Sequence, residues 1–191
     1  MKKTPKSLRL QIGLFGRTNV GKSSFLNLVA GQDVAIVSAV PGTTTDVVEK
    51  SMELLPLGPV VFLDTAGMDD ISVLAELRLK KTRKIFDRSD VIVLLVEADI
   101  WTGYEENIWN EARTRNIPVI AVINKVDIAQ PSGDFLEGLK KRIARIVPVS
   151  SIDFARRDTY INPLKKYLIE VCPDDFLNPP PLISDLVPAG G

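Results

Sequence analysis

The sequence predicts a three-layer α/β fold around a six-stranded, mostly parallel sheet with one antiparallel strand. Two nearly continuous apolar runs, Val91–Ala98 and Val119–Lys125, have the composition of strands that are covered on both faces, as in parallel sheets. Strand-like runs alternate along the chain with segments of helical length, which is typical of this class of fold. The turn-forming stretch Pro56–Pro59 separates two further strands and predicts that they pair in antiparallel fashion.

The N-terminal elements are a strand, a helix and a long loop. Leu8–Phe15 is a strand-like run, and a helix is expected near Lys22–Ala30, with an apolar face made by Phe25, Leu26 and Val29. Gly31 follows at the place where a glycine commonly ends a helix. The next segment, Gln32–Thr45, has no hydrophobic period and is predicted to be a loop.

The antiparallel pair comes next, followed by the second half of the sheet. Asp46–Leu54 alternates like a half-exposed strand and Val60–Asp64 folds back on it, while a helix near Glu105–Arg115 separates the two buried strands. Residues 145–151 supply the sixth strand. A last helix is predicted to start with Asn162 as N-cap and Pro163 as its first residue, with an apolar stripe of Leu164, Tyr167, Leu168 and Val171.

Length and composition indicate one domain with short tails. We predict a flexible tail over residues 1–7, a domain over residues 8–172 and a linker or tail rich in proline and glycine over residues 173–191. The 24 basic residues balance the 24 acidic ones, which argues against a general nucleic-acid surface. A single cysteine, no histidine and no apolar run of membrane-spanning length fit a cytoplasmic protein without a disulfide framework, a membrane segment or an iron–sulfur cluster of its own.

The stretch GRTNVGKS, Gly16–Ser23, matches the phosphate-binding P-loop and lies in the expected place between a strand and a helix. Its glycines let backbone N–H groups surround phosphate oxygens, and the helix N-terminus adds its dipole. Lys22 brings a positive charge to the β- and γ-phosphates, and the Ser23 hydroxyl is a ligand for Mg²⁺. The nucleotide-binding residues predicted here are Asn19, Val20, Gly21, Lys22, Ser23 and Ser24.

A second motif, DTAG, ends the predicted strand at Asp64. Asp64 is the acidic residue that holds Mg²⁺, through water, and Gly67 can present its N–H to the γ-phosphate without a side chain in the way. Many small GTPases carry glutamine after this motif to orient the attacking water. This chain has Met68 there, and a thioether neither accepts a proton nor orients water well. Either hydrolysis is slow or another group positions the water.

The third motif, NKVD, Asn124–Asp127, predicts the choice of base. Asp127 can accept hydrogen bonds from the N1–H and 2-amino groups of guanine, a donor pair that adenine lacks. Asn124 can tie the base pocket to the P-loop, and the Lys125 stem can cover the face of the base. Ser150 and Ser151 lie in a loop whose backbone N–H groups are predicted to contact the guanine oxygen.

The P-loop, DTAG, NKVD and the loop with Ser150 and Ser151 are four motifs whose order resembles that of the TrmE/Era/EngA-like P-loop GTPases. This resemblance implies a Ras-like α/β/α P-loop GTPase fold with GTP or GDP and Mg²⁺ as ligands. The stretches "AIVSAVPGTTTD", "LPLGPVVFLDTAG" and "AELRLKKT" are most similar to the GTPase domain of the [FeFe]-hydrogenase maturation GTPases, the HydF family. Thr45 replaces the arginine usual in the wider group. That resemblance implies cluster-binding and dimerisation domains outside this chain, and hydrogenase maturation proteins as partners. It leaves open a homodimer across the GTPase faces.

The resemblance also implies an answer to the missing glutamine. Several relatives hold K⁺ beside the phosphates through a P-loop asparagine, which is Asn19 here, and through backbone carbonyls, here of Ser38 and Val40. Thr43 lies nearby, and Thr44 would be the second Mg²⁺ ligand. A cation there stabilises charge on the transferred phosphate. Glu76 aligns with a glutamate that acts on the water in one relative, but it also suits the solvated first turn of a helix. The predicted catalytic residues are therefore Lys22, Gly67 and Glu76.

Three function classes stay open from the sequence. The first is a K⁺-stimulated GTPase that acts as a molecular switch in [FeFe]-hydrogenase cofactor maturation. The alternative is an RNA-associated GTPase of ribosome assembly or tRNA modification, which shares the motifs; the balanced charge and the lack of a recognisable RNA-binding module favour the first. The third is a nucleotide-binding interaction module with negligible turnover, which Met68 keeps open.

Overall fold

The computed structural model describes residues 9–31, 47–65 and 75–177 of the 191-residue chain. Within these ranges one six-stranded sheet has the order β2-β3-β1-β4-β5-β6. All neighbouring pairs are parallel except β2 with β3, which confirms the predicted fold class. The strands are β1 (Leu10–Gly16), β2 (Val48–Leu54), β3 (Gly58–Asp64), β4 (Val91–Glu97), β5 (Val119–Asn124) and β6 (Arg145–Pro148).

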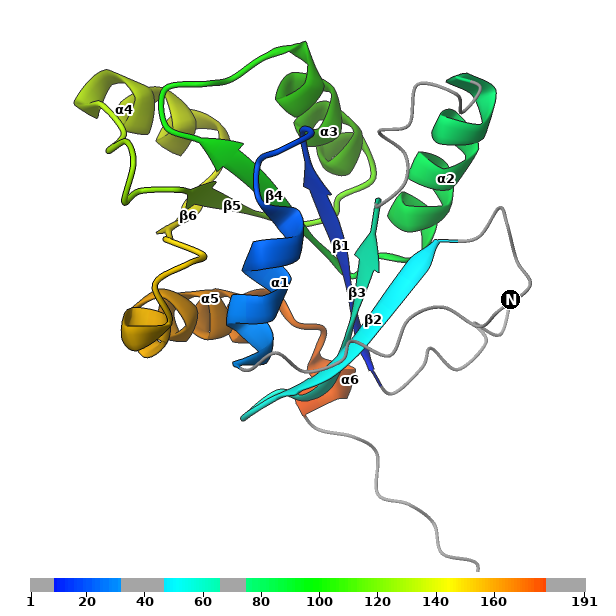
Figure 1. The fold of residues 1–191 in the computed structure, drawn as a ribbon. Coiled ribbons are helices and arrows are strands. Elements are labelled where there is room, and N and C mark those ends of the chain that lie inside the picture. The colour runs from blue at the N-terminus through cyan, green and yellow to red at the C-terminus, as the bar shows by residue number, and fades with distance from the viewer. Residues whose placement is uncertain (1–8, 32–46, 66–74, 178–191) are drawn as a thin grey trace, which may run out of the picture.

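Helices cover both faces of the sheet (Figure 1). One apolar core joins the sheet to α1 (Lys22–Ala30), α5 (Arg157–Val171) and Phe176 of the short α6 (Asp174–Leu177). The other core joins the opposite face to α2 (Ala75–Arg88), α3 (Gly103–Thr114) and α4 (Gly133–Arg142). This is the three-layer arrangement expected of a parallel sheet, whose central strands have no exposed face.

The central strands are buried as their composition predicts. Every residue from Val91 to Val96 is fully buried, and the same holds from Ile120 to Ile123. On the α2 side, the rings of Phe15 and Phe86 stack with their centroids 4.8 Å apart. Each fully buried aliphatic side chain contributes roughly 1.5–3 kcal/mol relative to an exposed one. The burial therefore gives the strand ends a rigid base from which loops can present functional groups.

Helix α1 agrees with its sequence prediction at both ends, whereas α5 does not. Gly31 follows α1 with φ 84°, and its N–H donates to the Asn27 carbonyl, so glycine is needed for this left-handed cap. The predicted start of the last helix at Asn162 and Pro163 is wrong, because α5 begins at Arg157 and contains Pro163.

A contact with α1 explains the longer α5. The Arg157 guanidinium donates to the carbonyls of Leu28 at 2.7 Å and Val29 at 2.6 Å, so it caps the C-terminus of α1 from another element. Ile161, one turn further along α5, is fully buried. A proline inside a helix costs about 3 kcal/mol or more, and these contacts of the additional turns oppose that cost.

Three described α-helices, α2, α4 and the short α6, received no bounds in the sequence prediction, and α6 lies in the stretch predicted to be a linker or tail. The start of α4 carries a recognisable signal, since the Ser132 hydroxyl accepts from the Phe135 N–H at 3.2 Å as an N-cap. Asp99 lies in the turn after β4 and accepts a hydrogen bond from the same hydroxyl at 2.6 Å, which fixes the cap in place. None of the described helices combines the length and the apolar character needed to cross a membrane.

Candidate functional site

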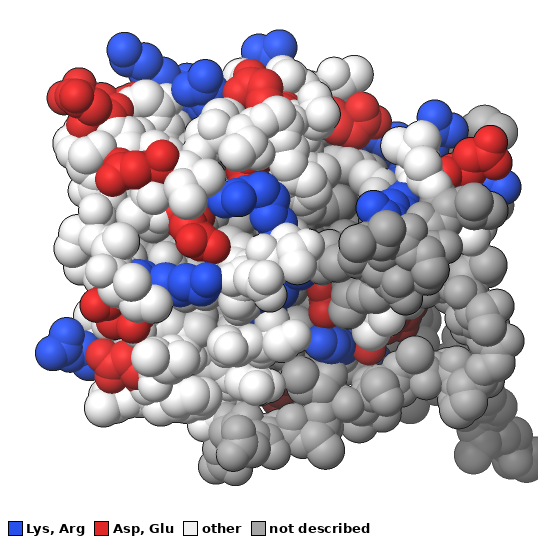
Figure 2. Space-filling view, turned by 45° about the horizontal axis from the view of Figure 1, so that its top comes forward, with Lys and Arg blue, Asp and Glu red and all other residues white. Residues whose placement is uncertain are grey.

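The predicted motifs meet at one edge of the sheet, beyond the carboxyl ends of the parallel strands. The P-loop follows β1, Asp64 ends β3, and Asn124 ends β5. Ligands of open α/β sheets bind in this position, because loops from neighbouring strands converge there. Figure 2 shows lysine and arginine mixed with aspartate and glutamate on one face of the molecule, in keeping with a net charge of +0.

The P-loop has the backbone that its sequence requires. Asn19 and Gly21 both lie in the left-handed region, with φ 64° and 96°, while Val20 between them is fully buried. A side chain at position 21 would be strained by φ, and its Cβ would lie 2.4 Å from the Asn124 amide nitrogen. Glycine is therefore required twice over at this position. The exposed Ser23 and Ser24 occupy the first turn of α1, whose N-cap Gly21 offers no side-chain cap to the orphan N–H groups.

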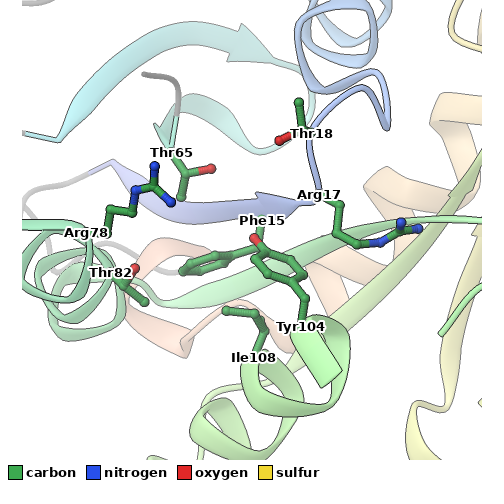
Figure 3. Close-up of a pocket in the computed structure, with 8 residues that line it drawn as sticks. All are labelled: Phe15, Arg17, Thr18, Thr65, Arg78, Thr82, Tyr104 and Ile108. Carbon is green, nitrogen blue, oxygen red and sulfur yellow. The ribbon is translucent and has the colours of Figure 1, made fainter. Parts of the chain in front are cut away.

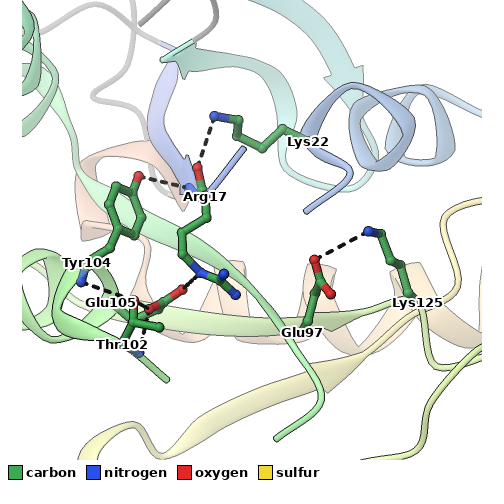
Figure 4. Close-up of polar contacts among 8 residues, drawn as sticks. Arg17, Lys22, Glu97, Thr102, Tyr104, Glu105 and Lys125 are labelled. Carbon is green, nitrogen blue, oxygen red and sulfur yellow. Dashed lines mark hydrogen bonds and ion pairs between the residues drawn. The ribbon is translucent and has the colours of Figure 1, made fainter. Parts of the chain in front are cut away.

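Lys22 is held in the site by backbone and hydroxyl oxygen. Its ammonium group donates to the Gly16 carbonyl at 3.0 Å and to the Thr65 hydroxyl at 3.0 Å (Figure 4 draws the first bond). The first contact folds the side chain back over the loop, and the second links it to the end of β3. The charge thus faces the space that the loop encloses, where phosphate oxygens are expected.

Asn124 connects the P-loop with the loop after β6. Its amide nitrogen donates to the Val20 carbonyl at 2.9 Å, and its amide oxygen accepts from the Ser151 hydroxyl at 2.7 Å and the Ser151 N–H at 3.2 Å. The residue is 1% exposed, so these bonds form away from water. One buried side chain therefore fixes two segments that lie more than a hundred residues apart.

Two further residues of the NKVD motif make equally specific contacts. The exposed Asp127 accepts a hydrogen bond from the buried Ser150 hydroxyl at 2.7 Å. A carboxylate has about four acceptor positions, so it can still receive two donors from a base. Lys125 has φ 62° and its ammonium group donates to the Asn19 carbonyl at 2.5 Å and lies 3.3 Å from the Glu97 carboxylate. The Lys125 side chain is thus a second link from the end of β5 to the P-loop. Figure 4 shows its contact with Glu97 of β4.

The donor set at the phosphate end fits Mg²⁺. Asp64 is 2% exposed, and its carboxylate lies 3.0 Å from the Lys50 ammonium group on β2. A carboxylate and the Ser23 hydroxyl are hard oxygen ligands, and Mg²⁺ in phosphate sites needs only one or two such protein groups besides phosphate and water. Lys50 is the counter-charge of the buried Asp64 carboxylate, and a divalent ion could bind to the same carboxylate.

The remaining predicted residues divide into two groups. Ser38, Val40, Thr43, Thr44 and Gly67 lie outside the described residues, so the K⁺ carbonyls, the second Mg²⁺ ligand and the γ-phosphate N–H stay predictions. Glu76 is exposed in the first turn of α2, where a carboxylate favours the positive end of the helix dipole. This placement fits a solvated glutamate at the start of a helix, and the catalytic role of Glu76 stays a prediction. Asn19 is exposed in the P-loop, so its side chain is accessible to a cation.

Sequence reasoning missed several residues on the α3 side of the P-loop. Tyr104, Glu105 and Arg17 form contacts between α3 and the P-loop (Figure 4), and Thr65 holds Lys22. Beside them is a cavity of about 550 Å³ between the P-loop, α2 and α3 (Figure 3), lined by Phe15, Thr18, Thr65, Arg78, Tyr104 and Ile108 among others. These contacts join residues more than forty positions apart, and the only local signal was the T-x-x-E capping pattern at Thr102.

A sequence model of one protein family matches residues 11–125, more than half of the chain. The family is described as 50S ribosome-binding GTPase. The chain belongs to this GTPase family. The match covers the P-loop, Asp64 and the start of the NKVD motif. It supports GTP hydrolysis as the chemistry of the family.

Curated and solved relatives agree with the GTPase assignment. The tRNA modification GTPase MnmE of Synechococcus sp. strain JA-2-3B'a(2-13) is 42% identical over 126 residues, which is 65% of this chain and 27% of the relative. A variant of Aquifex aeolicus Era bound to GDP·AlF4⁻ is 30% identical with a TM-score of 0.62, covering 82% of this chain and 56% of Era. Era in complex with MgGDPNP and nucleotides 1506–1542 of 16S ribosomal RNA has a TM-score of 0.63 at the same identity and coverage.

The GTPase chain is shorter than these relatives. It spans 27% of the length of the Synechococcus protein and 34% of a Prochlorococcus marinus MnmE. The likeness thus concerns a GTPase domain. The names of the curated relatives correspond to the tRNA-modification alternative and give no support to hydrogenase maturation.

Proposed function

We propose that this chain is the switch domain of a longer protein: it binds GTP with Mg²⁺, hydrolyses it to GDP and phosphate, and passes the change to a partner or another domain. The bridge made by Asn124 carries the proposal, because it joins the phosphate-binding loop to the loop predicted to hold the base. A generic glycine-rich turn would not need such a link. Buried and held by three hydrogen bonds, the bridge would set the distance between the two ends of a nucleotide.

Each described group has a defined part in this reaction. Lys22 and the N–H groups at the start of α1 bind the β- and γ-phosphates, while Ser23 and Asp64 hold Mg²⁺, which would neutralise charge on the phosphates. Asp127 selects guanine, since only a base with two adjacent donors satisfies its carboxylate. Ser150 orients that carboxylate through its own hydroxyl. Hydrolysis needs little covalent chemistry from the protein, so positioning and charge are the main contributions.

Base specificity tests the nucleotide assignment. Fluorescent GDP and ADP analogues should bind with affinities that differ at least a hundredfold, because ADP leaves the Asp127 acceptors unpaired. Asp127→Asn keeps an acceptor for the Ser150 hydroxyl but reverses the pattern towards xanthine, so it should weaken GDP and favour xanthosine diphosphate. Asp134→Asn, an exposed carboxylate in the first turn of α4, is the matched control. Equal GDP affinity in Asp127→Asn and wild type would disprove the base pocket.

Potassium is the proposed replacement for the missing glutamine. Asn19 supports the proposal, as it lies exposed in the P-loop with a left-handed backbone fixed by the Lys125 contact. Turnover should be faster in KCl than in NaCl at the same ionic strength, and Asn19→Ala should remove the difference. Equal rates in the two salts would exclude K⁺. Glu76→Ala, with the exposed Glu137→Ala as control, tests the second candidate; an unchanged rate removes Glu76 from the mechanism.

The process that uses this switch has two candidates. The curated relatives favour an RNA-associated GTPase, specifically one of tRNA modification. Thr45 in "GTTTD", together with the stretches that resemble the HydF family, supports hydrogenase maturation instead. The gene beyond residue 191 distinguishes them: a cysteine- and histidine-rich domain supports the second, and its absence together with tRNA binding by the full-length protein supports the first.

The location and assembly of the full-length protein are further parts of the proposal. A cytoplasmic protein should appear in the soluble fraction of its own cells. A dimer formed across the GTPase faces should depend on GTP and K⁺ in sedimentation experiments on this chain. A dimer formed through other domains should need the full-length protein and should not respond to the nucleotide.

A further inference from the structure

Helix α3 is bonded directly to the first residues of the P-loop. The Tyr104 hydroxyl oxygen accepts from the Gly16 N–H at 3.2 Å, and the Arg17 Nε donates to the Glu105 carboxylate at 2.5 Å. The two contacts are adjacent on both partners, Gly16 with Arg17 and Tyr104 with Glu105. In Figure 4 they lie side by side, with the Arg17 side chain reaching towards the start of α3.

Glu105 is a fixed anchor for this contact. Its side chain is fully buried, and its carboxylate also accepts from the Thr102 hydroxyl and, at 2.7 Å, from the Thr102 N–H, which completes a capping box at the start of α3. Burial acts to raise the pKa of Glu105, but hydrogen bonds from Thr102, Arg17 and backbone N–H groups together lower it. The carboxylate is therefore charged at neutral pH, and Arg17 is its cationic partner.

Gly16 carries the contact from α3 to the phosphate-binding lysine. Its N–H donates to Tyr104, while its carbonyl accepts from the Lys22 ammonium group at 3.0 Å. Lys22 continues the chain of hydrogen bonds to the Thr65 hydroxyl. The N–H and the carbonyl belong to successive peptide groups, so a shift of the Gly16 backbone would move the carbonyl that holds Lys22. An added Cβ on Gly16 would lie 2.6 Å from the Val20 side chain, so the residue must be small where the loop packs on itself.

We propose that Tyr104 and Arg17 are positioning residues for nucleotide binding. They act through Gly16 and Glu105 and hold the P-loop in the form in which Lys22 faces the β- and γ-phosphates. The inference rests on the proposed function and extends it, because it makes the start of α3 part of the phosphate site. Neither residue needs to touch the nucleotide. A simple role in stability would affect the folded fraction of the protein but not the affinity of the folded domain.

The test uses Tyr104→Phe and Arg17→Lys, which keep the ring and the charge. Affinity for fluorescent GDP and GTP analogues should fall about three- to tenfold in Tyr104→Phe, the range expected for one hydrogen bond. KM for GTP should rise by the same factor while kcat stays unchanged, because the loop supports ground and transition state equally. Arg17→Ala should weaken binding more than Arg17→Lys, so that lysine gives partial rescue.

Two variants in the opposite layer are controls. Tyr167→Phe removes a hydroxyl from α5, and Ile161→Val lowers stability through a small cavity in the core without removing a hydrogen bond to the P-loop. Melting temperatures without nucleotide are measured for all variants. Affinity that falls only in the α3 and Arg17 variants supports the proposal. Affinity equal to that of Ile161→Val at equal stability overturns it. If wild type binds no guanine nucleotide, the proposed function itself fails.

Discussion

Replacement of Asn124 by alanine should destabilise the domain even when no nucleotide is bound. The side chain makes three hydrogen bonds, to the Val20 carbonyl and to the Ser151 hydroxyl and N–H. Each is worth about 1 kcal/mol net, so their loss amounts to about 3 kcal/mol. The true cost is expected at or above this figure, because the Val20 carbonyl and the Ser151 N–H would be left in a buried region without their partner.

The loss is large enough to measure by thermal unfolding. For a domain of this size, about 1 kcal/mol shifts the melting temperature by roughly 2–4 °C, so Asn124→Ala should melt about 6–12 °C below wild type. Circular dichroism on nucleotide-free protein gives the shift. Asn107→Ala, an exposed asparagine on α3, is the matched control and should not lower the melting temperature, since alanine is the better helix former.

The same variant should also lose nucleotide affinity beyond what its stability explains. With the bridge gone, the P-loop and the Ser151 loop are no longer held at a fixed separation, so GDP must order them on binding. Affinity measured well below the melting temperature separates the two effects. A melting temperature within about 2 °C of wild type, roughly 1 kcal/mol or less, would refute the argument that this bridge is a main structural support of the site.

Three more variants follow from other contacts. Lys50→Met should melt lower than wild type without Mg²⁺, because the buried Asp64 loses its counter-charge. The variant should nevertheless reach half-maximal turnover at a lower Mg²⁺ concentration. A Mg²⁺ titration with the exposed Lys140→Met as control checks this, and an unchanged midpoint contradicts it. Arg157→Ala should cost about 1–3 kcal/mol in urea unfolding, since two carbonyls at the end of α1 lose their donor; a loss below about 0.5 kcal/mol would show that water replaces the arginine. Because the pKa of folded Glu105 is lowered, it adds stability above its unfolded pKa of about 4.3 and loses it as pH falls through the folded value. The stability difference between wild type and Glu105→Gln should therefore be full near pH 7 and shrink at acid pH, and a difference independent of pH would contradict the shift.

The sequence was sufficient where the governing interactions are local. The P-loop, the bounds of α1 and the Gly31 cap follow from residues a few positions apart, and the structure has α1 over the predicted range. The antiparallel pair followed from one turn. The start of α5 could not be predicted this way, because Arg157 bonds to carbonyls about 130 positions earlier in the chain. Tyr104 and Arg17 were missed for the same reason, at a separation of 88 residues.

The two ends of the site differ in how far the protein alone completes them. At the proposed base end, Ser151 bonds to Asn124 and Ser150 bonds to Asp127, so protein groups alone hold these side chains in place. At the proposed phosphate end, Thr65 contacts Lys22 and Lys50 contacts Asp64, so phosphate oxygens and Mg²⁺ would compete with these two protein groups.

This difference assigns different tasks to the two halves of the nucleotide. Under the proposed function, a preformed base pocket would give specificity with little reorganisation, so guanine would be selected in either nucleotide state. Arrival of the phosphates would instead exchange partners at Lys22 and Asp64. Thr65, which loses Lys22 in that exchange, directly precedes the alanine and glycine that complete DTAG. We therefore expect the γ-phosphate signal to pass through Thr65, while the proposed task of Tyr104 and Arg17 is to keep the P-loop itself in place.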